Sequence, residues 1–455
     1  MQKLTFLATA VLIGALLYPA TVYSQSSSEL EYRKYRVTLV PGLSTNGVDA
    51  YRYNARYSLN ILAGYHGGLE GYELGFVNIN RKFSRGVQVG GLNATGGEMS
   101  GVQIASFGNL SSGEQQGVQI SGIGNLSGQN MQGVQISGLG NISATSMRGV
   151  QITGGVNIGS EIQGIQIGGI GNFSRGAAQG LQFSGITNIS GGSAQGLMFS
   201  GITNISGASS QGLHFAGVAN IASGTSQGFL FSGVTNISDM QQGIIGTGVV
   251  NISRQFQGIQ FAGVANIAET GQGVQIGLFN TAREFEGIPV GLISYYGNGR
   301  KNLDVWFTDG GFTHLGMNLG MHDIYNKLSV GFNPFIPDRN VWALSWSIGT
   351  YRTLEEAWNR PKLQDYFSTH DFTIQRIFDD KWSSTTNAIF SYKYLLGKNL
   401  TSKTSLYVGP SLNLQISKQP GNSDYTWYNI TESAREDRDV RFWVGFTAGV
   451  RLFGQ

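Results

Sequence analysis

Cysteine is absent from this chain of 455 residues, so no disulfide stabilises the fold, which depends on its core and on backbone hydrogen bonds. Charged residues make up only 13%, and the formal net charge is +3, which argues against the concentrated basic surface that nucleic-acid binding needs. Beyond residue 24 no apolar run reaches the length of a membrane-spanning helix, so any insertion into a membrane would require β-strands. The 68 glycines show no three-residue period, which excludes a collagen helix.

The N-terminus has the features of an export signal. Lys3 supplies the positive charge, residues 4–17 form the apolar segment, and Val22 and Ser24 are small residues in front of a cleavage site before Gln25. A single membrane anchor is the alternative, but the apolar run is short for a spanning helix. We therefore expect residues 1–24 to be a signal peptide and the protein to be exported.

Charge and tryptophan are both unevenly distributed along the chain. Residues 86–286 contain only 11 charged residues and no tryptophan, whereas all seven tryptophans follow residue 300. This shift in composition indicates a domain boundary. The expected organisation is a set of N-terminal β-strands in residues 25–70, a repeat domain in residues 71–300 and a C-terminal antiparallel β domain in residues 301–455.

The repeat domain consists of about fifteen copies of one pattern with a spacing of 15 or 16 residues. Each copy reads Gly, apolar, Gln, apolar, small, Gly, apolar, small, Asn, apolar, small, followed by a short polar stretch, as in GVQISGIGNLSGQNMQ from Gly117. We number positions within a repeat from its first glycine. A fixed period of this kind predicts a repeat architecture in which each copy packs on its neighbours.

Two all-β architectures fit these repeats, a β-solenoid of about fifteen coils and one large antiparallel β-barrel in which each repeat is a strand. The apolar positions 2, 4, 7 and 10 lose their two-residue phase at the glycine of position 6, which is typical of a corner in a coil. An antiparallel barrel should show a two-repeat period and aromatic girdles, and the repeats show neither. The pattern therefore favours the solenoid.

In a solenoid, the apolar positions of each coil, such as Val118, Ile120, Ile123 and Leu126, are expected to fill a narrow core. The first glycine of each repeat is expected to form a turn, and the position-3 glutamines to form an outward row. Asparagines at position 9 would stack as a structural ladder, because a column of amides can form hydrogen bonds from coil to coil. The expected turn glycines are Gly117, Gly133, Gly149, Gly180 and Gly196. The expected outward glutamines are Gln103, Gln119, Gln135, Gln151, Gln166 and Gln182. The expected ladder comprises Asn109, Asn125, Asn141, Asn157, Asn172, Asn188, Asn204, Asn220, Asn236, Asn251 and Asn266.

After residue 300 the sequence changes to long strands of alternating apolar and polar residues. Residues 403–418 and 439–453 are clear examples, and about eight such strands can be counted. Alternation with aromatic residues near the strand ends is typical of an outer-membrane β-barrel. We expect such a barrel, closed by pairing with the strands of residues 25–70; a soluble antiparallel sandwich in the periplasm is the alternative.

The phrases GYELGFVNINRKFSRGVQVGGLNATGG and GIPVGLISYYGNG, together with the repeated GVQI-x-G-x-x-N motif, carry a family resemblance. Over residues 35–310 the chain resembles the bacterial surface-repeat proteins first described in leptospires and common in Bacteroidetes. The biochemical function of that family is uncharacterised. The resemblance implies a repeat fold and a location at the cell surface or outer membrane, and it supplies no catalytic residues.

The sequence nominates no catalytic, cofactor-binding or metal-binding residue. Its histidines are not spaced as metal ligands, no serine or cysteine nucleophile motif occurs, and GxGxxG-like strings arise from the repeat itself. We therefore expect a non-enzymatic exported repeat protein at the outer membrane or cell surface of a Gram-negative-type bacterium, without cofactors. Its role would be structural or binding, with the outer membrane as partner and adhesion to glycans or surface proteins as further contacts. The alternative is an outer-membrane channel or transport protein with the repeats in the barrel wall.

Overall fold

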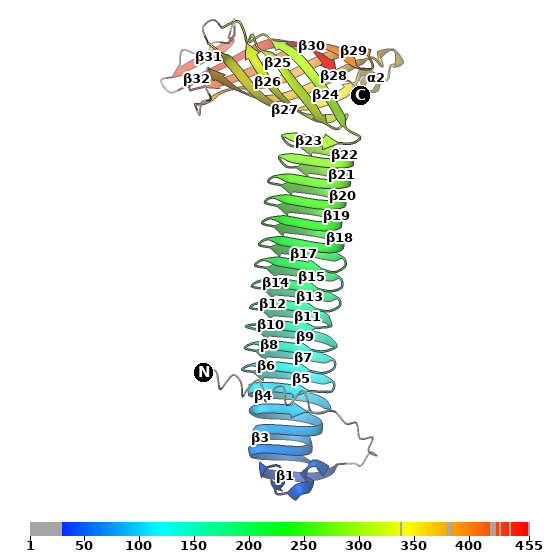
Figure 1. Cartoon of the computed structure of the whole chain (residues 1–455), viewed down its shortest axis with the longest axis vertical. Coiled ribbons are helices and arrows are strands. Elements are labelled where there is room, and N and C mark those ends of the chain that lie inside the picture. The colour runs from blue at the N-terminus through cyan, green and yellow to red at the C-terminus, as the bar shows by residue number, and fades with distance from the viewer. Residues whose placement is uncertain are drawn as a thin grey trace.

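A computed structural model describes residues 30–336, 339–379, 382, 385–418, 425–426, 429–435 and 438–453. They form a long rod of stacked β-coils with a β-barrel at one end (Figure 1). The expected signal peptide of residues 1–24 lies outside the described residues. Over those that are described, no helix is long and apolar enough to cross a membrane.

The rod begins with the N-terminal strands, which are its first coils. β1 (Glu31–Val40) pairs in parallel with the start of β3 (Tyr53–Thr95), and β2 (Leu43–Ser44) and the 3-10 helix η1 (Gly47–Arg52) connect them. β3 continues through several coils and then pairs in parallel with β4 (Glu98–Ser111). These first coils lie at the far end of the rod from the barrel (Figure 1). The expectation that this segment pairs with the tail is therefore wrong.

Each later repeat forms one coil, and every coil pairs in parallel with the next at an offset of one repeat, so that Gly117 lies beside Gly133 and Asn125 beside Asn141. This parallel register confirms the β-solenoid and rules out one large antiparallel barrel. The longer strands of the coils are β5 (Gln115–Ser121), β7 (Met131–Ser137), β9 (Ser146–Thr153), β11 (Glu161–Gly168), β13 (Ala178–Ser184), β15 (Ala194–Ser200) and β17 (Ser210–Ala216). The shorter ones are β6 (Gly124–Ser127), β8 (Gly140–Ser143), β10 (Val156–Gly159), β12 (Gly171–Ser174), β14 (Thr187–Ser190) and β16 (Thr203–Ser206). Beyond them the strands are β18 (Ala219–Ser232), β19 (Thr235–Thr247), β20 (Val250–Ala262), β21 (Ala265–Ile276), β22 (Phe279–Val290) and β23 (Ile293–Tyr296).

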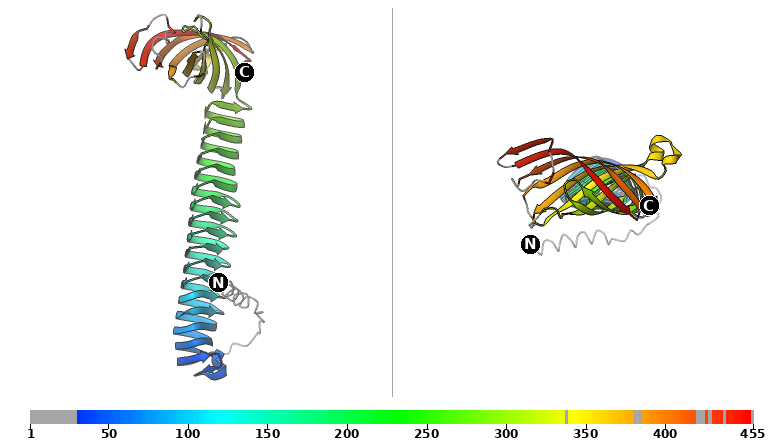
Figure 2. Two further views of the ribbon diagram at one scale, coloured as in Figure 1. Left: turned by 60° about the vertical axis from the view of Figure 1, so that its left-hand side comes forward. Right: turned by 90° about the horizontal axis from the view of Figure 1, so that it is seen from above.

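From β5 to β17 each coil has two corners, which join its longer and shorter strands, whereas from β18 to β22 one strand continues through the second corner. One corner lies at positions 6 and 7, for example Gly122 and Ile123, and we call it the apolar corner. The other lies in the polar stretch of each repeat, for example residues 128–130, and we call it the polar corner. Because the coils are in register, each corner forms an edge that runs the length of the rod (Figure 2).

The core of the rod is the inverse of the one expected. Gln119 and Asn125 are 0% and 2% exposed, whereas Ile120 and Ile123, expected in the core, are 37% and 45% exposed. The interior holds positions 3, 5, 9 and 11 together with a small apolar column such as Met131. Parallel coils about 4.8 Å apart place identical amides within hydrogen-bonding distance, so a polar interior costs little there. The apolar side chains consequently point outward.

The C-terminal barrel has eight antiparallel strands in sequence order, and β24 pairs with β32 to close it, for example through Leu303 with Leu452. Closure therefore does not use the N-terminal strands. The strands are β24 (Arg300–Thr308), β25 (Thr313–Gly320), β26 (Ile324–Asn333), β27 (Val341–Thr353), β28 (Tyr366–Asp379), β29 (Asn387–Thr401), β30 (Thr404–Ser417) and β32 (Arg438–Leu452). Three minor elements accompany them, β31 (Thr431–Arg435), the helix α2 (Leu354–Trp358) and the 3-10 helix η2 (Pro361–Leu363).

The last coil of the rod packs against the outer wall of the barrel. Asn326 of β26 donates a hydrogen bond to the Pro289 carbonyl and another to Ser294, and the Trp346 indole donates to the Gly291 carbonyl at 2.6 Å. One end of the barrel carries α2 and the C-terminus, and the other carries β31; in Figure 1 these ends lie on opposite sides of the rod. The barrel axis therefore runs across the axis of the rod.

Candidate interaction surface

The position-9 asparagines lie in one buried column inside the rod, and we call this column the Asn ladder. In each, the side-chain Nδ2 donates to the Oδ1 of the asparagine one coil later, at 2.8–3.1 Å, and to a main-chain carbonyl of that coil. The second acceptor fixes the amide orientation, so all of the amides point in the same direction. Its members from the repeats are Asn109, Asn125, Asn141, Asn157, Asn172, Asn188, Asn204, Asn220, Asn236, Asn251 and Asn266.

Both ends of the Asn ladder are capped by polar side chains. At the start, His66 Nε2 lies 2.9 Å from the Oδ1 of Asn60, the first amide of the series. At the finish, Asn280 Nδ2 donates to Ser294, which also accepts from Asn326 of the barrel. The ladder thus extends from the N-terminal coils to the barrel wall. Burial lowers the pKa of His66 to about 3, with Arg36 as a further cause, so the imidazole is neutral at neutral pH.

The position-3 glutamines form a second ladder that points the opposite way, and the expectation of an outward row is wrong. Each Nε2 donates to the Oε1 of the glutamine one coil earlier, at 2.7–2.8 Å. The series ends at Glu73, which accepts from Gln88 and is paired with Arg36 at 3.0 Å. Although burial favours the neutral acid, the Arg36 guanidinium holds the pKa of Glu73 below its usual range. The buried members are Gln103, Gln119, Gln135, Gln151, Gln166 and Gln182.

This Gln ladder is interrupted after Gln182, where the column continues with Met198, His214 and Leu230. The Oε1 of Gln182 and the Nε2 of His214 are buried there without a hydrogen-bond partner. Burial lowers the pKa of His214 to about 4. His214 thus occupies the glutamine position of its repeat as a buried core residue.

The first glycine of each repeat is required by backbone geometry, but it does not form a turn. Gly117 and its equivalents from Gly86 to Gly287 lie inside strands, with φ between 113° and 140°, a region that favours glycine. A Cβ atom at any of them would overlap the carbonyl oxygen of the glycine one coil earlier. The turn expectation is therefore wrong, and the physical reason for glycine is the close approach of successive backbones. The residues concerned are Gly117, Gly133, Gly149, Gly180 and Gly196.

The apolar corner presents rows of exposed aliphatic and aromatic side chains along the rod. Position 7 is the most prominent row, and it is about 40–65% exposed; position 4 forms a parallel row, with the glycines of position 6 between them. All 11 charged residues of the region 86–286 lie at position 11 or later, in the polar stretch. The rod therefore has an apolar edge and a polar edge. Exposed members at position 7 are Phe107, Ile123, Leu139, Ile170, Ile186, Ile202, Val218, Val234, Val249 and Val264, and Leu278 continues the row one position earlier in its shorter repeat.

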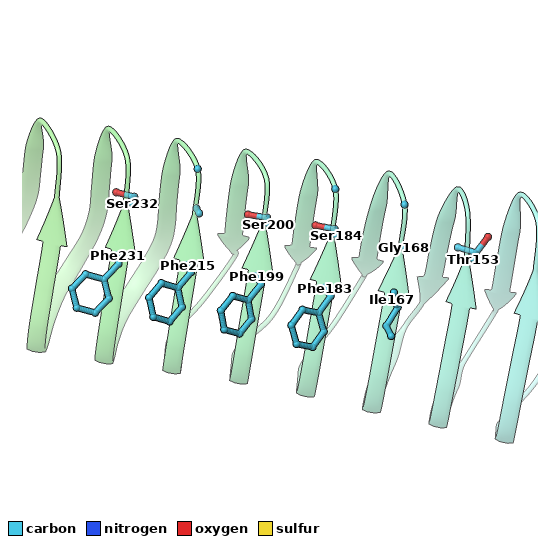
Figure 3. A pocket seen from close by; sticks show the side chains of 14 residues that line it. Thr153, Ile167, Gly168, Phe183, Ser184, Phe199, Ser200, Phe215, Phe231 and Ser232 are labelled. Atoms are coloured by element: carbon cyan, nitrogen blue, oxygen red, sulfur yellow. The ribbon is translucent and has the colours of Figure 1, made fainter.

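Beside this edge, an open apolar groove of about 570 Å³ crosses six coils. Its floor carries the stacked rings of Phe183, Phe199, Phe215 and Phe231, whose centroids are 5.0–5.4 Å apart (Figure 3). Glycines of position 6 form its other side, which keeps the surface shallow. The groove is a part of the apolar edge rather than an enclosed pocket.

Most main-chain amides of the apolar corner donate coil-to-coil hydrogen bonds, and those of Gly155 and Val249 donate to threonine side chains of their own coils. The amide of Ile186 donates to the Ile170 carbonyl, that of Ile202 to Ile186, and that of Val218 to Ile202, at 2.9–3.0 Å. Adjacent amides at positions 6 and 8 donate in the same way. The apolar edge therefore exposes side-chain carbon without leaving these N–H groups unpaired.

The barrel has the same inverted distribution of side chains. Its interior holds charged residues within hydrogen-bonding distance, with Arg451 on Asp304 at 2.9 Å and Lys327 between Asp304 and Asp371 at 3.3 and 2.9 Å. Aromatic side chains such as Trp306 and Tyr407 fill much of the remaining interior. Its outer wall exposes Val305, Leu315, Met317, Leu328, Val330, Phe332, Phe372, Ile374, Phe390, Leu396, Leu406, Val408, Leu412, Leu414 and Phe446.

Comparisons with known protein families, with curated proteins and with solved structures find no match for this chain. Within the part of the chain that the structure describes, no group of three or more His, Asp or Glu side chains is placed to hold a metal ion. The apolar edge of the rod and the apolar wall of the barrel are thus the features from which a function can be argued.

Proposed function

We propose that the protein is a non-enzymatic outer-membrane repeat protein, in which the barrel is the membrane anchor and the rod provides a structural or binding surface. The observation that carries this proposal is the inverted barrel, with apolar side chains outside and charged side chains, several of them paired, inside. A membrane barrel faces lipid with its outer wall and keeps its polar residues within. In a soluble sandwich the same apolar wall would be exposed to water.

The position of the charged residues supports the same conclusion. Lys327, Asp304 and Asp371 are all buried in the barrel interior, where each has a partner. Burial of unpaired charge is costly, and the two carboxylates lie against the cations of Lys327 and Arg451. Two further buried cations, Lys393 and Arg300, lie over the rings of Trp306 and Tyr351. The outer wall, by contrast, combines strand backbones that are hydrogen-bonded around a closed ring with side chains that suit hydrocarbon.

A pair of arginine substitutions tests the anchor. Val330 is 54% exposed at the middle of β26, and Val330→Arg should destabilise the inserted barrel by about 2–4 kcal/mol if this position faces the bilayer centre. Ser402→Arg, in the turn between β29 and β30, is the matched control and should insert normally. The measurement is the fraction of protein that resists urea and carbonate extraction from lipid vesicles. Equal insertion of both variants, or a monodisperse protein without detergent, would contradict the proposal.

The channel alternative receives no support from the barrel interior. An eight-stranded barrel is just wide enough for its inward side chains to fill it, and here Trp306, Tyr407, Arg451 and Lys327 occupy that space. The repeats, moreover, form the rod and not the barrel wall. We expect no stable conductance when the purified protein is added to planar bilayers.

A further inference from the structure

The orientation of the rod can be inferred from its edges, on the assumption that the barrel is inserted as proposed above. The apolar edge carries no charged residue over residues 86–286, and its exposed rows extend over many coils. Such an edge far exceeds the isolated apolar residues that ordinary water-exposed surfaces contain. It therefore requires a hydrophobic occupant.

The junction shows which way the apolar edge faces. Gly291 belongs to the apolar corner of the last coil, and its carbonyl accepts from Trp346 in the middle of β27, on the apolar outer wall. Tyr296, at the other end of β23, leads through residues 297–299 to the start of β24 at the barrel end that carries the C-terminus. The apolar corner thus meets the barrel at the level of its apolar wall, and the polar corner lies towards one end of the barrel.

The direction of the rod relative to the barrel shows where the rest of the apolar edge lies. The rod runs across the barrel axis (Figures 1 and 2), so a membrane that surrounds the barrel wall lies parallel to the rod. The successive coils pair through the same repeat positions from β5 to β23, with one register shift between Ala222 and Thr225, which lies outside the apolar corner. Figures 1 and 2 show these coils stacked in one orientation, so the apolar edge keeps facing the side on which it meets the wall. The paired backbone of the apolar corner also meets the requirement that lipid sets for any main chain in contact with it.

We propose that the rod lies along the membrane that holds the barrel, with its apolar edge among the lipid acyl chains and its polar corner in water. The occupant is lipid rather than a second copy, because the edge is continuous with a wall that the proposed anchor already places in lipid. The rod is then a long amphipathic strip at the interface. Binding of this kind scales with the apolar area that enters the boundary between headgroups and acyl chains.

The absence of cysteine makes site-specific labelling straightforward. Ile202→Cys places a probe on the apolar edge, Ser209→Cys places one on the polar corner of the same coil, and Val330→Cys places one on the barrel wall. Each full-length variant carries a single environment-sensitive fluorophore and is reconstituted in phosphatidylethanolamine–phosphatidylglycerol vesicles with nitroxide-labelled acyl chains. We expect the probes at 202 and 330 to lose fluorescence to a similar extent, and the probe at 209 to be quenched by aqueous iodide instead.

Two results would overturn the inference while leaving the membrane anchor intact. Quenching at 330 together with iodide access at 202 would mean that the rod stands free in water. Quenching at 330, with 202 shielded from both quenchers and crosslinked between molecules, would mean that a second copy covers the edge. Absence of lipid quenching at 330 would instead refute the proposed anchor, and the inference with it. Val218→Cys, one coil further along the same row, repeats the test if the Ile202 variant does not fold.

Discussion

Replacement of Asn141 by alanine is expected to destabilise the rod by several kcal/mol, because this side chain has four hydrogen-bonding partners in the interior, three of which share its two amide hydrogens. Its Nδ2 donates to the Ile152 carbonyl at 2.9 Å, to Asn157 Oδ1 at 3.0 Å and to the Gln135 carbonyl at 3.3 Å, and its Oδ1 accepts from Asn125 at 2.9 Å. A buried hydrogen bond contributes about 1 kcal/mol net, and an orphaned buried group costs about 1–3 kcal/mol. The substitution should therefore cost about 3–5 kcal/mol.

Asn130→Ala is the matched control for this prediction. Asn130 lies on the polar corner near Asn141, is exposed, and bonds to Thr145 and Ser146 through its side chain. Surface substitutions of this kind usually change the unfolding free energy by about 0.5 kcal/mol. The assay is urea unfolding of the full-length protein in detergent, followed by far-UV circular dichroism, with hydrogen exchange of residues 133–165 as a local readout.

Asn141→Asp separates hydrogen bonding from side-chain volume. Aspartate has nearly the same shape, but its carboxylate faces the three oxygens that the Asn141 amide now serves. Because no cation is among these partners, the folded state should raise the pKa of this acid, and stability should recover as the pH falls through that raised value. Two results would refute the ladder as a source of stability. One is that Asn141→Ala lowers the unfolding free energy no more than Asn130→Ala does, and the other is that the stability of Asn141→Asp does not depend on pH in the acidic range.

Three further substitutions test other parts of the fold. Gly133→Ala should lower the unfolding free energy measured in urea by at least about 2 kcal/mol, because its φ of 134° and the neighbouring carbonyl leave no room for a Cβ. Gly140→Ala should be nearly neutral, because the equivalent residue one coil later is Val156. His214→Met should make the stability of the rod less sensitive to acid. The pKa of His214 is about 4 in the folded protein and about 6.5 in the unfolded chain, so the wild type should lose about 2 kcal/mol of unfolding free energy between about pH 7 and pH 5. The variant should not show this loss. Lys327→Met should lower the stability of the barrel by about 3–5 kcal/mol, because two buried carboxylates lose this cation. Lys403→Met, at an exposed position, should leave the stability unchanged. The measurement is the temperature at which the folded band disappears in SDS gels.

The sequence carried enough information to predict the architecture. The fixed spacing from Gly117 to Gly133 and onward predicts stacked coils, and the loss of phase at position 6 predicts the corner that the structure contains. The alternation in residues 403–418 likewise predicts a barrel-type strand, found as β30. These features depend on local periodicity, which a single sequence displays directly.

The direction in which side chains point could not be obtained from the same periodicity. Alternation shows that Gln119 and Ile120 lie on opposite faces of a strand, but it does not say which face is inside. We assigned the apolar face to the core because that is the rule in water. A column of identical amides at the coil spacing reverses this rule, because Gln119 and Gln135 form a hydrogen bond with each other inside the rod and are therefore stable there.

A signal for the inverted core was nevertheless present in the sequence. Every charged residue from 86 to 286 falls at position 11 or later, as Glu98, Arg148 and Asp239 illustrate. Solvent-exposed strands of a water-soluble solenoid should also carry charge at positions 2, 4 and 10. Its absence there predicts an apolar outer surface at these positions, and this is the observation from which the apolar edge could have been predicted. The ion network around Lys327, by contrast, depends on barrel closure and has no local signal.

Finally, the two ends of the barrel differ in a way that predicts which side of the membrane the rod occupies. At the end where β24 begins, the strands are joined by residues 321–323, 354–365 and 402–403, and two of these three connections are tight turns. At the other end they are joined by residues 309–312, 334–340, 380–386 and 418–437, and this last connection, which includes β31, is the longest of all. Outer-membrane barrels have short turns on the periplasmic side and long loops outside. With the proposed anchor, the polar corner then faces the periplasm, where its partners would be periplasmic proteins or glycans rather than other cells. A membrane-impermeant maleimide should therefore label Ser209→Cys only after the outer membrane of intact cells is permeabilised; labelling of intact cells would reverse this assignment and restore the expected display at the cell surface.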